Sequence, residues 1–167
     1  PPPPPPYFQA PPGIRDCTRS LVGSEMCIRD RYYTIPFGKA AQLREGNRLS
    51  LITYGAGVHW ALEALDEMGL TEVDLLDLRT LCPLDLEAVF QSVRKTGKVL
   101  LLQEDTLFGG VMADVAAQIG EHCFESLDAP VKRVGSLETP VPFARSLEAG
   151  FLPQSRLRSA LEELWAY

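Results

Sequence analysis

Strand-like apolar segments alternate with helical patterns from residue 49 to residue 167, and this alternation limits the fold more than any other feature. The segment at 73–78 is almost continuously apolar, which is typical of a strand covered on both faces. Strands are expected at residues 49–54, 73–78, 98–103 and 131–134. Because helices between successive strands connect parallel neighbours, we expect an α/β fold with a three-layer αβα arrangement and a mostly parallel sheet.

Apolar residues at helical spacing occupy the segments between these strands. Gly69 and Gly97 are expected to end the first two helices, since glycine readily adopts the left-handed conformation of a helix C-terminus. Asp85 is expected to cap the second helix through its side chain. A last amphipathic helix is expected at residues 155–165.

The N-terminal fifth of the chain does not follow this pattern. Six prolines begin the sequence, and the word Ile-Arg-Asp occurs twice between residues 14 and 31 without strand or helix periodicity. Residues 1–31 are therefore expected to be a disordered or non-native leader, and the chain to be a fragment of a longer polypeptide. Residues 32–48 are expected to be a connecting segment, and residues 49–167 to form the domain.

Composition excludes two classes of partner. A net charge of −6, without a cluster of Lys and Arg, argues against nucleic acid as a partner. The apolar runs are too short to span a bilayer, so no membrane association is expected. The four cysteines show neither zinc-ligand nor disulfide-framework spacing, which favours a reducing, cytoplasmic location.

A glycine-rich loop after the first expected strand invites a dinucleotide-binding interpretation. Gly55 and Gly57 fit the first two glycines of that motif, and Asp77 lies at the distance of its ribose-binding acid. Trp60 occupies the position of the third glycine, where its bulk opposes close packing of helix and strand. A tight strand-to-helix turn is therefore the favoured interpretation.

Other polar residues lie where α/β proteins place ligands. His59 follows the first strand. The sequence contains no Gly-x-Ser-x-Gly nucleophile motif and no second histidine at metal-ligand spacing, so we expect His59 to be a surface or interface histidine. Glu104 and Asp105 follow the third strand. They could share a proton or bind a cation. The favoured alternative is that one of them accepts backbone hydrogen bonds from the turn at residues 109–110. Cys82 has no base assigned to it and is expected to be a structural thiol.

Taken together, the motifs resemble the C-terminal, transketolase C-terminal-like domain of the β subunit of 2-oxoacid dehydrogenase E1 components. The similarity covers about residues 32–167. The motifs that carry it lie, in order, at residues 35–40, 44–46, 52–55, 77–81, 83–85, 95–98, 127–131, 139–144 and 151–153.

The resemblance implies an enzyme that decarboxylates a 2-oxo acid on thiamine diphosphate with magnesium and passes the acyl group to an E2 acyltransferase. In this family the cofactor-activating residues lie in other segments, so we assign no catalytic, cofactor-binding or metal-binding residue here. We expect this chain alone to bind no cofactor and to be inactive. The implied partners are an E1 α subunit or domain, a second E1 β subunit, and the peripheral-subunit-binding domain of E2.

The same resemblance implies a docking role for two residues. Some members bind E2 through an acidic residue in the Leu-acidic-Ala-Pro-Val turn and through an aromatic last residue, and the matching positions here are Asp128 and Tyr167. Carboxylates are otherwise frequent in this third of the chain, which alone indicates only a solvated face. Many relatives carry histidine at the position of Gln103, so a titrating role for that residue cannot be carried over.

Substrate choice remains open at this point. The run at residues 121–124 resembles branched-chain 2-oxoacid dehydrogenases, which we prefer; pyruvate or acetoin dehydrogenase is the alternative. A noncatalytic assembly module is the alternative from a different functional class.

Overall fold

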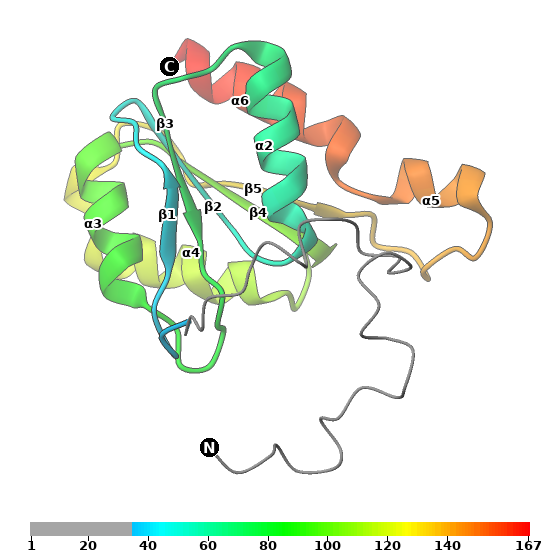
Figure 1. The fold of residues 1–167 in the computed structure, drawn as a ribbon, viewed down its shortest axis with the longest axis horizontal. Coiled ribbons are helices and arrows are strands. Elements are labelled where there is room, and N and C mark those ends of the chain that lie inside the picture. Colours follow the sequence, from blue (N-terminus) through cyan, green and yellow to red (C-terminus); the bar gives the residue numbers. More distant parts are fainter. Residues whose placement is uncertain (1–34) are drawn as a thin grey trace, which may run out of the picture. The chain divides into compact units, whose positions relative to one another are not determined.

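The computed structural model describes residues 35–167, and the expected leader at residues 1–31 lies outside the described residues. Five strands form one sheet in the order β1-β3-β2-β4-β5, shown in Figure 1. Residues 37–167 form one compact unit. The expected three-layer α/β fold with a mostly parallel sheet is confirmed, and none of its described helices is long and apolar enough to cross a membrane.

Four parallel strands make up most of the sheet. Their bounds are β2 (Leu49–Thr53), β3 (Val73–Asp77), β4 (Val99–Thr106) and β5 (Lys132–Ser136). β2 pairs with β3 on one side and with β4 on the other, and β5 pairs with β4. All four expected strands are present, but β4 runs three residues past the predicted end at Gln103.

The sheet also contains a strand that the sequence did not predict. β1 (Ala41–Arg44) pairs antiparallel with β3 and lies within the segment assigned as a connection. Its four residues are partly or fully exposed, and its pairing contains a register irregularity between Gln42 and Arg44. Because so short an edge strand buries no apolar stripe, it leaves little periodicity in the sequence.

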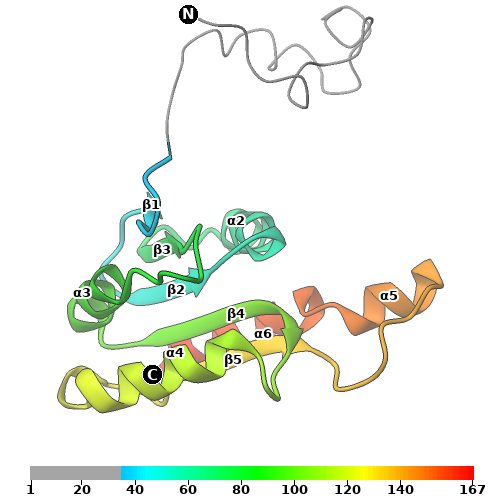
Figure 2. The same cartoon turned by 90° about the horizontal axis from the view of Figure 1, so that it is seen from below.

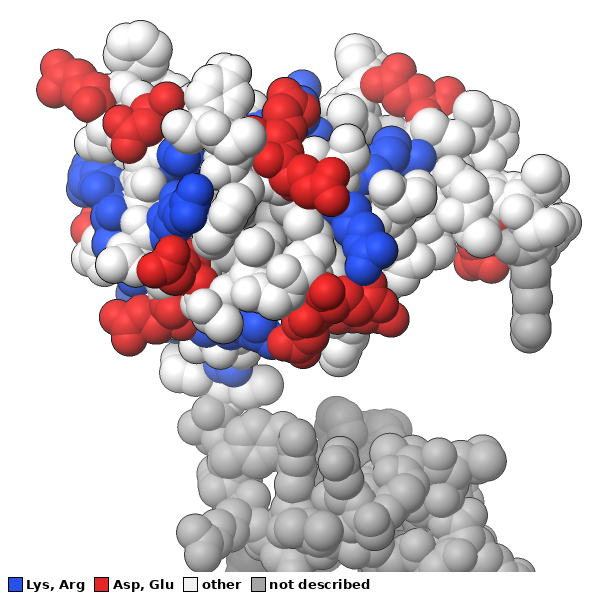
Figure 3. All heavy atoms as spheres, turned by 90° about the horizontal axis from the view of Figure 1, so that it is seen from above, with Lys and Arg blue, Asp and Glu red and all other residues white. Residues whose placement is uncertain are grey.

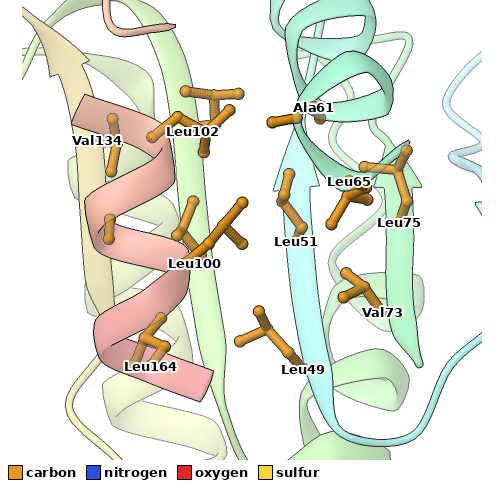
Figure 4. Packing of buried hydrophobic residues seen from close by; sticks show 14 of the residues in the cluster. Leu49, Leu51, Ala61, Leu65, Val73, Leu75, Leu100, Leu102, Val134 and Leu164 are labelled. Carbon is orange, nitrogen blue, oxygen red and sulfur yellow. The ribbon is translucent and has the colours of Figure 1, made fainter. Parts of the chain in front are cut away.

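Two helices cover one face of the sheet. α2 (Ala56–Met68) packs over β2 and β3, and α6 (Gln154–Ala166) packs over β4 and β5. Leucines meet at the centre of this layer, as Figure 4 shows. The fully buried members of this cluster include Leu49, Leu51, Leu65, Leu75, Leu100, Leu102 and Leu161.

The opposite face is covered by α3 (Leu86–Thr96) and α4 (Val111–His122). Val89 and Val93 from α3 and Met112 and Ile119 from α4 are fully buried in this second core. Because successive residues of a strand point to opposite faces, Leu101 faces this core while Leu100 and Leu102 face the other.

The predicted helix ends are confirmed. Gly69 and Gly97 adopt positive φ angles of 65° and 69° directly after α2 and α3. The Asp85 carboxylate accepts a hydrogen bond from the Ala88 N–H, as expected of a helix cap.

Two short helices were not predicted from the sequence. The 3-10 turn η2 (Phe124–Ser126) follows α4, and α5 (Arg145–Phe151) precedes α6. Figure 2 shows α5 beyond the ends of β4 and β5, outside the three layers. Seven residues without a buried apolar stripe give too weak a pattern to identify a helix.

Candidate functional site

Two edges of the sheet hold the residues of interest. We call the edge where β2, β4 and β5 begin the amino edge; it includes Arg48, Gly97 and Asp128. The edge where these strands end is the carboxyl edge; it includes Tyr54, residues 104–110 and residues 137–152. α/β proteins commonly bind ligands at the carboxyl ends of parallel strands.

The glycine-rich loop forms the tight turn that the sequence favoured. A Cβ atom on Gly57 would collide with the Thr53 hydroxyl, so the turn requires glycine at this position. Trp60 packs against the leucine core at the position of the missing third glycine. Asp77 accepts a hydrogen bond of 3.0 Å from the Arg79 N–H, which gives it a local structural role.

The histidines and cysteines between residues 35 and 167 are not brought together into a reactive group. His59 is exposed in the first turn of α2 as expected, whereas the His122 ring lies 5.1 Å from the ring of Phe90. Cys123 is buried, and Cys82 is exposed in the loop between β3 and α3. The sequence predicted a structural thiol at Cys82, and its exposed position in this loop does not test that role.

Gln103 organises the carboxyl edge through its side-chain amide. The side chain is fully buried; its Oε1 accepts a hydrogen bond of 3.0 Å from the Met112 N–H, and its Nε2 donates to the Thr106 carbonyl. A Cβ on Gly110 would collide with the same amide. Gln103 thus joins the end of β4 to the beginning of α4, a role that requires hydrogen bonding and no titration.

Glu104 and Asp105 differ from the favoured expectation. The Asp105 carboxylate accepts a hydrogen bond of 2.7 Å from the neighbouring Thr106 N–H. Gln103, rather than either acid, accepts a backbone N–H at the start of α4. The alternation of polar and apolar residues did not predict this contact, because β4 continues past residue 103 and its pairing with β5 is irregular between residues 102 and 106.

This irregularity opens a cavity of about 380 Å³ at the carboxyl edge, which we call the carboxyl-edge groove. Both carboxylates line it. Its lining comes from four separate parts of the chain and includes Tyr54, Glu104, Asp105, Val141, Glu148 and Phe151. The groove therefore combines acidic and apolar side chains.

The pKa of Tyr54 reflects the negative charge of the groove. Burial raises the pKa of its phenol, and the negative charges of Asp105 and Glu104 raise the pKa further. Both causes oppose ionisation of the Tyr54 phenol next to the two carboxylates. The sequence analysis did not identify Tyr54, although its position directly after the first strand is a recognisable signal.

Asp128 lies exposed at the amino edge, four residues before the first residue of β5. Its N–H donates a hydrogen bond of 2.8 Å to the Gly97 carbonyl. Its carboxylate covers Gly97 so closely that a Cβ on that glycine would collide with it. The end of α3 therefore holds the backbone of Asp128, and its carboxylate lies over Gly97.

Tyr167 lies at the same edge, at the end of α6, and its side chain is 64 % exposed. The Arg48 guanidinium donates a hydrogen bond of 3.1 Å to the Trp165 carbonyl and lies 4.1 Å from the centre of the Trp165 ring. Arg48 immediately precedes β2, so it holds the end of α6 at the amino edge. The structure thus places both predicted docking residues at one edge, without a direct contact between them.

A buried carboxylate that the sequence did not single out lies nearby on β3. Asp74 is 2 % exposed and accepts hydrogen bonds from Gln42, Ser92 and Lys95, and one from the Gly46 N–H. Burial alone would raise its pKa, but these hydrogen bonds outweigh burial and lower it. The network joins β1, β3 and α3, and its role is structural.

The described residues do not form a metal centre. Between residues 35 and 167, no group of three or more His, Cys, Asp or Glu side chains is placed to hold a metal ion. On the face shown in Figure 3, Lys and Arg side chains are interspersed with Asp and Glu. That face presents no continuous basic surface of the kind that follows a phosphate backbone.

Comparison with protein families places the chain among known domains. Residues 38–156 match the family model described as "Transketolase, C-terminal domain". The β subunit of 2-oxoisovalerate dehydrogenase from Bacillus subtilis is 43 % identical over 79 % of this chain, which corresponds to 42 % of that protein.

Two further relatives match a similar part of the chain at similar identity. The β subunit of an acetoin:2,6-dichlorophenolindophenol oxidoreductase from Bacillus subtilis is 43 % identical over 75 % of the chain and 37 % of that protein. The pyruvate dehydrogenase E1 β subunit of the same bacterium is 41 % identical over 77 % of the chain and 40 % of that protein. The chain thus spans about two fifths of the length of these relatives.

A solved structure shares the fold. It is described as a split-gene transketolase, an inactive β4 tetramer, and aligns with a TM-score of 0.66 at 25 % identity. The alignment covers 80 % of this chain and 43 % of that one.

Proposed function

The chain belongs to the transketolase C-terminal-domain family, and from that premise we propose that it assembles and docks a thiamine-diphosphate-dependent 2-oxoacid dehydrogenase. It is homologous to the β subunits of E1 components. Its proposed role is to join the other E1 chains, an α-type subunit and a second β-type subunit, and to bind the E2 acyltransferase in the cytoplasm.

In the part of the chain that the structure describes, no group of three or more His, Cys, Asp or Glu side chains is placed to hold a metal ion. We assign to these residues no ligand of the magnesium ion that accompanies the cofactor. We therefore derive no catalytic step from these residues. The cofactor supplies the carbanion chemistry in the complete enzyme, and this domain contributes assembly and docking.

This assignment makes a direct prediction about activity. Purified chain supplied with thiamine diphosphate, magnesium and 2-oxo acids is expected to show no decarboxylation, measured as release of carbon dioxide. Detectable turnover by the chain alone would refute the assignment of catalysis to other segments.

The amino edge carries the proposed docking site for E2. The observation that supports it is that Asp128 and Tyr167, which are distant in sequence, are both exposed at this edge. A hydrogen bond to Gly97 fixes Asp128, and the contact of Arg48 with Trp165 holds the helix that precedes Tyr167. We propose that both residues pair with basic residues of the E2 peripheral-subunit-binding domain.

Charge reversal tests this docking site. Asp128→Lys is expected to weaken binding of the E2 domain at least tenfold, or about 1.4 kcal/mol, because attraction becomes repulsion. Glu125→Lys is the matched control, since Glu125 is also exposed, lies three residues away and undergoes the same change in charge. Titration calorimetry at low and moderate salt measures both affinities; unchanged binding by Asp128→Lys at both salt concentrations would refute docking through this turn.

For the substrate, we propose a branched-chain 2-oxo acid. The run at residues 121–124 supports this choice through its resemblance to that group. Overall identity does not separate the candidates, because a 2-oxoisovalerate and an acetoin enzyme subunit are both 43 % identical to the chain. Values of kcat/KM for 2-oxoisovalerate, pyruvate and acetoin, measured on the complete enzyme, decide the question.

A further inference from the structure

Exposed apolar side chains occur in the chain segments that line the carboxyl-edge groove. Within residues 35–167, eleven large hydrophobic side chains are exposed, and five of these line the groove or lie within two residues of a lining residue. These five are Phe108, Leu137, Val141, Phe143 and Leu147. The Phe143 side chain is fully exposed and that of Phe108 is 85 % exposed. Apolar side chains gathered on one surface indicate an interaction site.

The groove between these side chains is negatively charged. Glu104 and Asp105 are exposed, and neither forms an ion pair with a Lys or Arg side chain that the structure describes. Their charge acts at the Tyr54 phenol, whose pKa is raised by burial and then by both carboxylates. A complementary ligand therefore needs a cation surrounded by apolar groups.

The charge of the groove argues against a second copy of this chain as its ligand. A two-fold contact centred on the groove would bring Glu104 and Asp105 of both copies together, and like charges disfavour such a contact. We therefore take the complementary surface from a different polypeptide.

We propose that the carboxyl-edge groove binds an apolar segment of a different polypeptide that places an arginine side chain against Glu104 and Asp105. Arginine fits better than lysine, because its planar guanidinium forms paired hydrogen bonds with carboxylates and stacks on an aromatic ring. Tyr54 supplies such a ring in the lining. The identity of the partner rests on the proposed function: it is the α-type subunit of the same E1 component.

Association with that subunit tests the proposal. Full-length chain is titrated with the purified α-type E1 subunit of the same organism, and the dissociation constant is measured by calorimetry. The double variant Glu104→Lys with Asp105→Lys is expected to weaken association at least tenfold, with the larger loss at low salt. The control, Glu121→Lys with Glu162→Lys, carries the same change in charge at exposed positions on α4 and α6 and is expected to bind like the unaltered chain.

A second variant tests the apolar part separately. Phe143→Ser removes an exposed ring without changing charge, so it is expected to weaken association severalfold at all salt concentrations while leaving the thermal unfolding midpoint unchanged. Equal affinities for the groove and control double variants would overturn the proposal. So would failure of the unaltered chain to bind the α-type subunit.

Sedimentation velocity distinguishes the remaining alternative. If the chain alone forms dimers that the groove double variant abolishes, a second copy occupies the groove and the proposal is wrong. The E2 affinity of each groove variant is measured in parallel and is expected to be unchanged, because Asp128 lies at the opposite edge. Failure of the groove proposal and failure of E2 docking are thus separately observable.

Discussion

The amino and carboxyl edges of the same sheet differ in how their exposed groups are held. At the amino edge, Asp128 is fixed on Gly97, and Arg48 holds the end of α6 through Trp165. At the carboxyl edge, buried Gln103 joins β4 to α4, Glu104 and Asp105 lie at the end of β4, and the exposed rings of Phe108 and Phe143 lie on loops.

This difference matches two kinds of partner. A pre-positioned carboxylate on a polar edge suits a charge-dominated contact, whose association rate and salt dependence it controls. An apolar rim around two carboxylates suits a contact that buries more hydrophobic surface and excludes water from an ion pair. One domain can therefore present chemically distinct surfaces without an insertion in its core.

The largest expected effect concerns Asp74, whose network supports the sheet near the amino edge. Its folded-state pKa is lowered below the unfolded value, so it stabilises the fold above the unfolded pKa, and this stability is lost as pH falls through the folded pKa. Asp74→Asn is expected to cost about 2 kcal/mol near neutral pH and to weaken the acid dependence of stability. Urea unfolding across acidic pH measures both effects.

The control for Asp74 is Asp66→Asn. Asp66 pairs with Arg44 at the surface and is 68 % exposed, so its loss is expected to cost less than about 1 kcal/mol. Similar costs for the two variants would show that the buried network contributes no more than a surface pair.

The next prediction compares two glycine substitutions, of which only one also disturbs Asp128. Gly97→Ala is expected to destabilise the fold by about 1–2 kcal/mol, because φ is 69° and the new Cβ collides with the Asp128 carboxylate. Gly69→Ala imposes similar strain at φ 65° with no neighbouring atom in the way. Only Gly97→Ala is expected also to weaken E2 binding; equal E2 affinities for the two variants would contradict a fixed Asp128.

The smallest effect is a change in a pKa at the carboxyl edge. Replacing Glu104 by Gln together with Asp105 by Asn is expected to lower the pKa of Tyr54, which should stay above its ordinary value because burial is the larger cause. Ultraviolet titration of tyrosinate measures it, and subtraction of a Tyr54→Phe titration isolates this phenol among five tyrosines. An unchanged pKa would show that the groove carries little negative potential.

Most of the fold was predictable because it depends on apolar periodicity. The four parallel strands and the helices facing them bury leucine and valine stripes that are visible in the sequence. β1 and α5 were missed because each is short and buries no stripe of its own. The extension of β4 past Gln103 was missed because Glu104 and Asp105 are polar and lie beyond the buried part of the strand.

The site was less predictable because it depends on which chain segments meet. The resemblance pointed to Asp128 and Tyr167, but their shared edge follows from the direction of α6, which lies antiparallel to the strands beneath it. The groove brings together Tyr54 from the loop after β2, Asp105 from the end of β4 and Val141 from the loop after β5. An irregular strand pairing determines this arrangement, and no local pattern encodes it.

The orientation of α6 has a mechanical consequence. Near its start, the Arg156 guanidinium donates hydrogen bonds to the carbonyls of Gly135 and Phe151 at one edge, and near its end Trp165 meets Arg48 at the other. Thirteen helical residues extend about 20 Å. The helix is thus a spacer with both ends fixed, which separates the two proposed docking surfaces by the length of the domain.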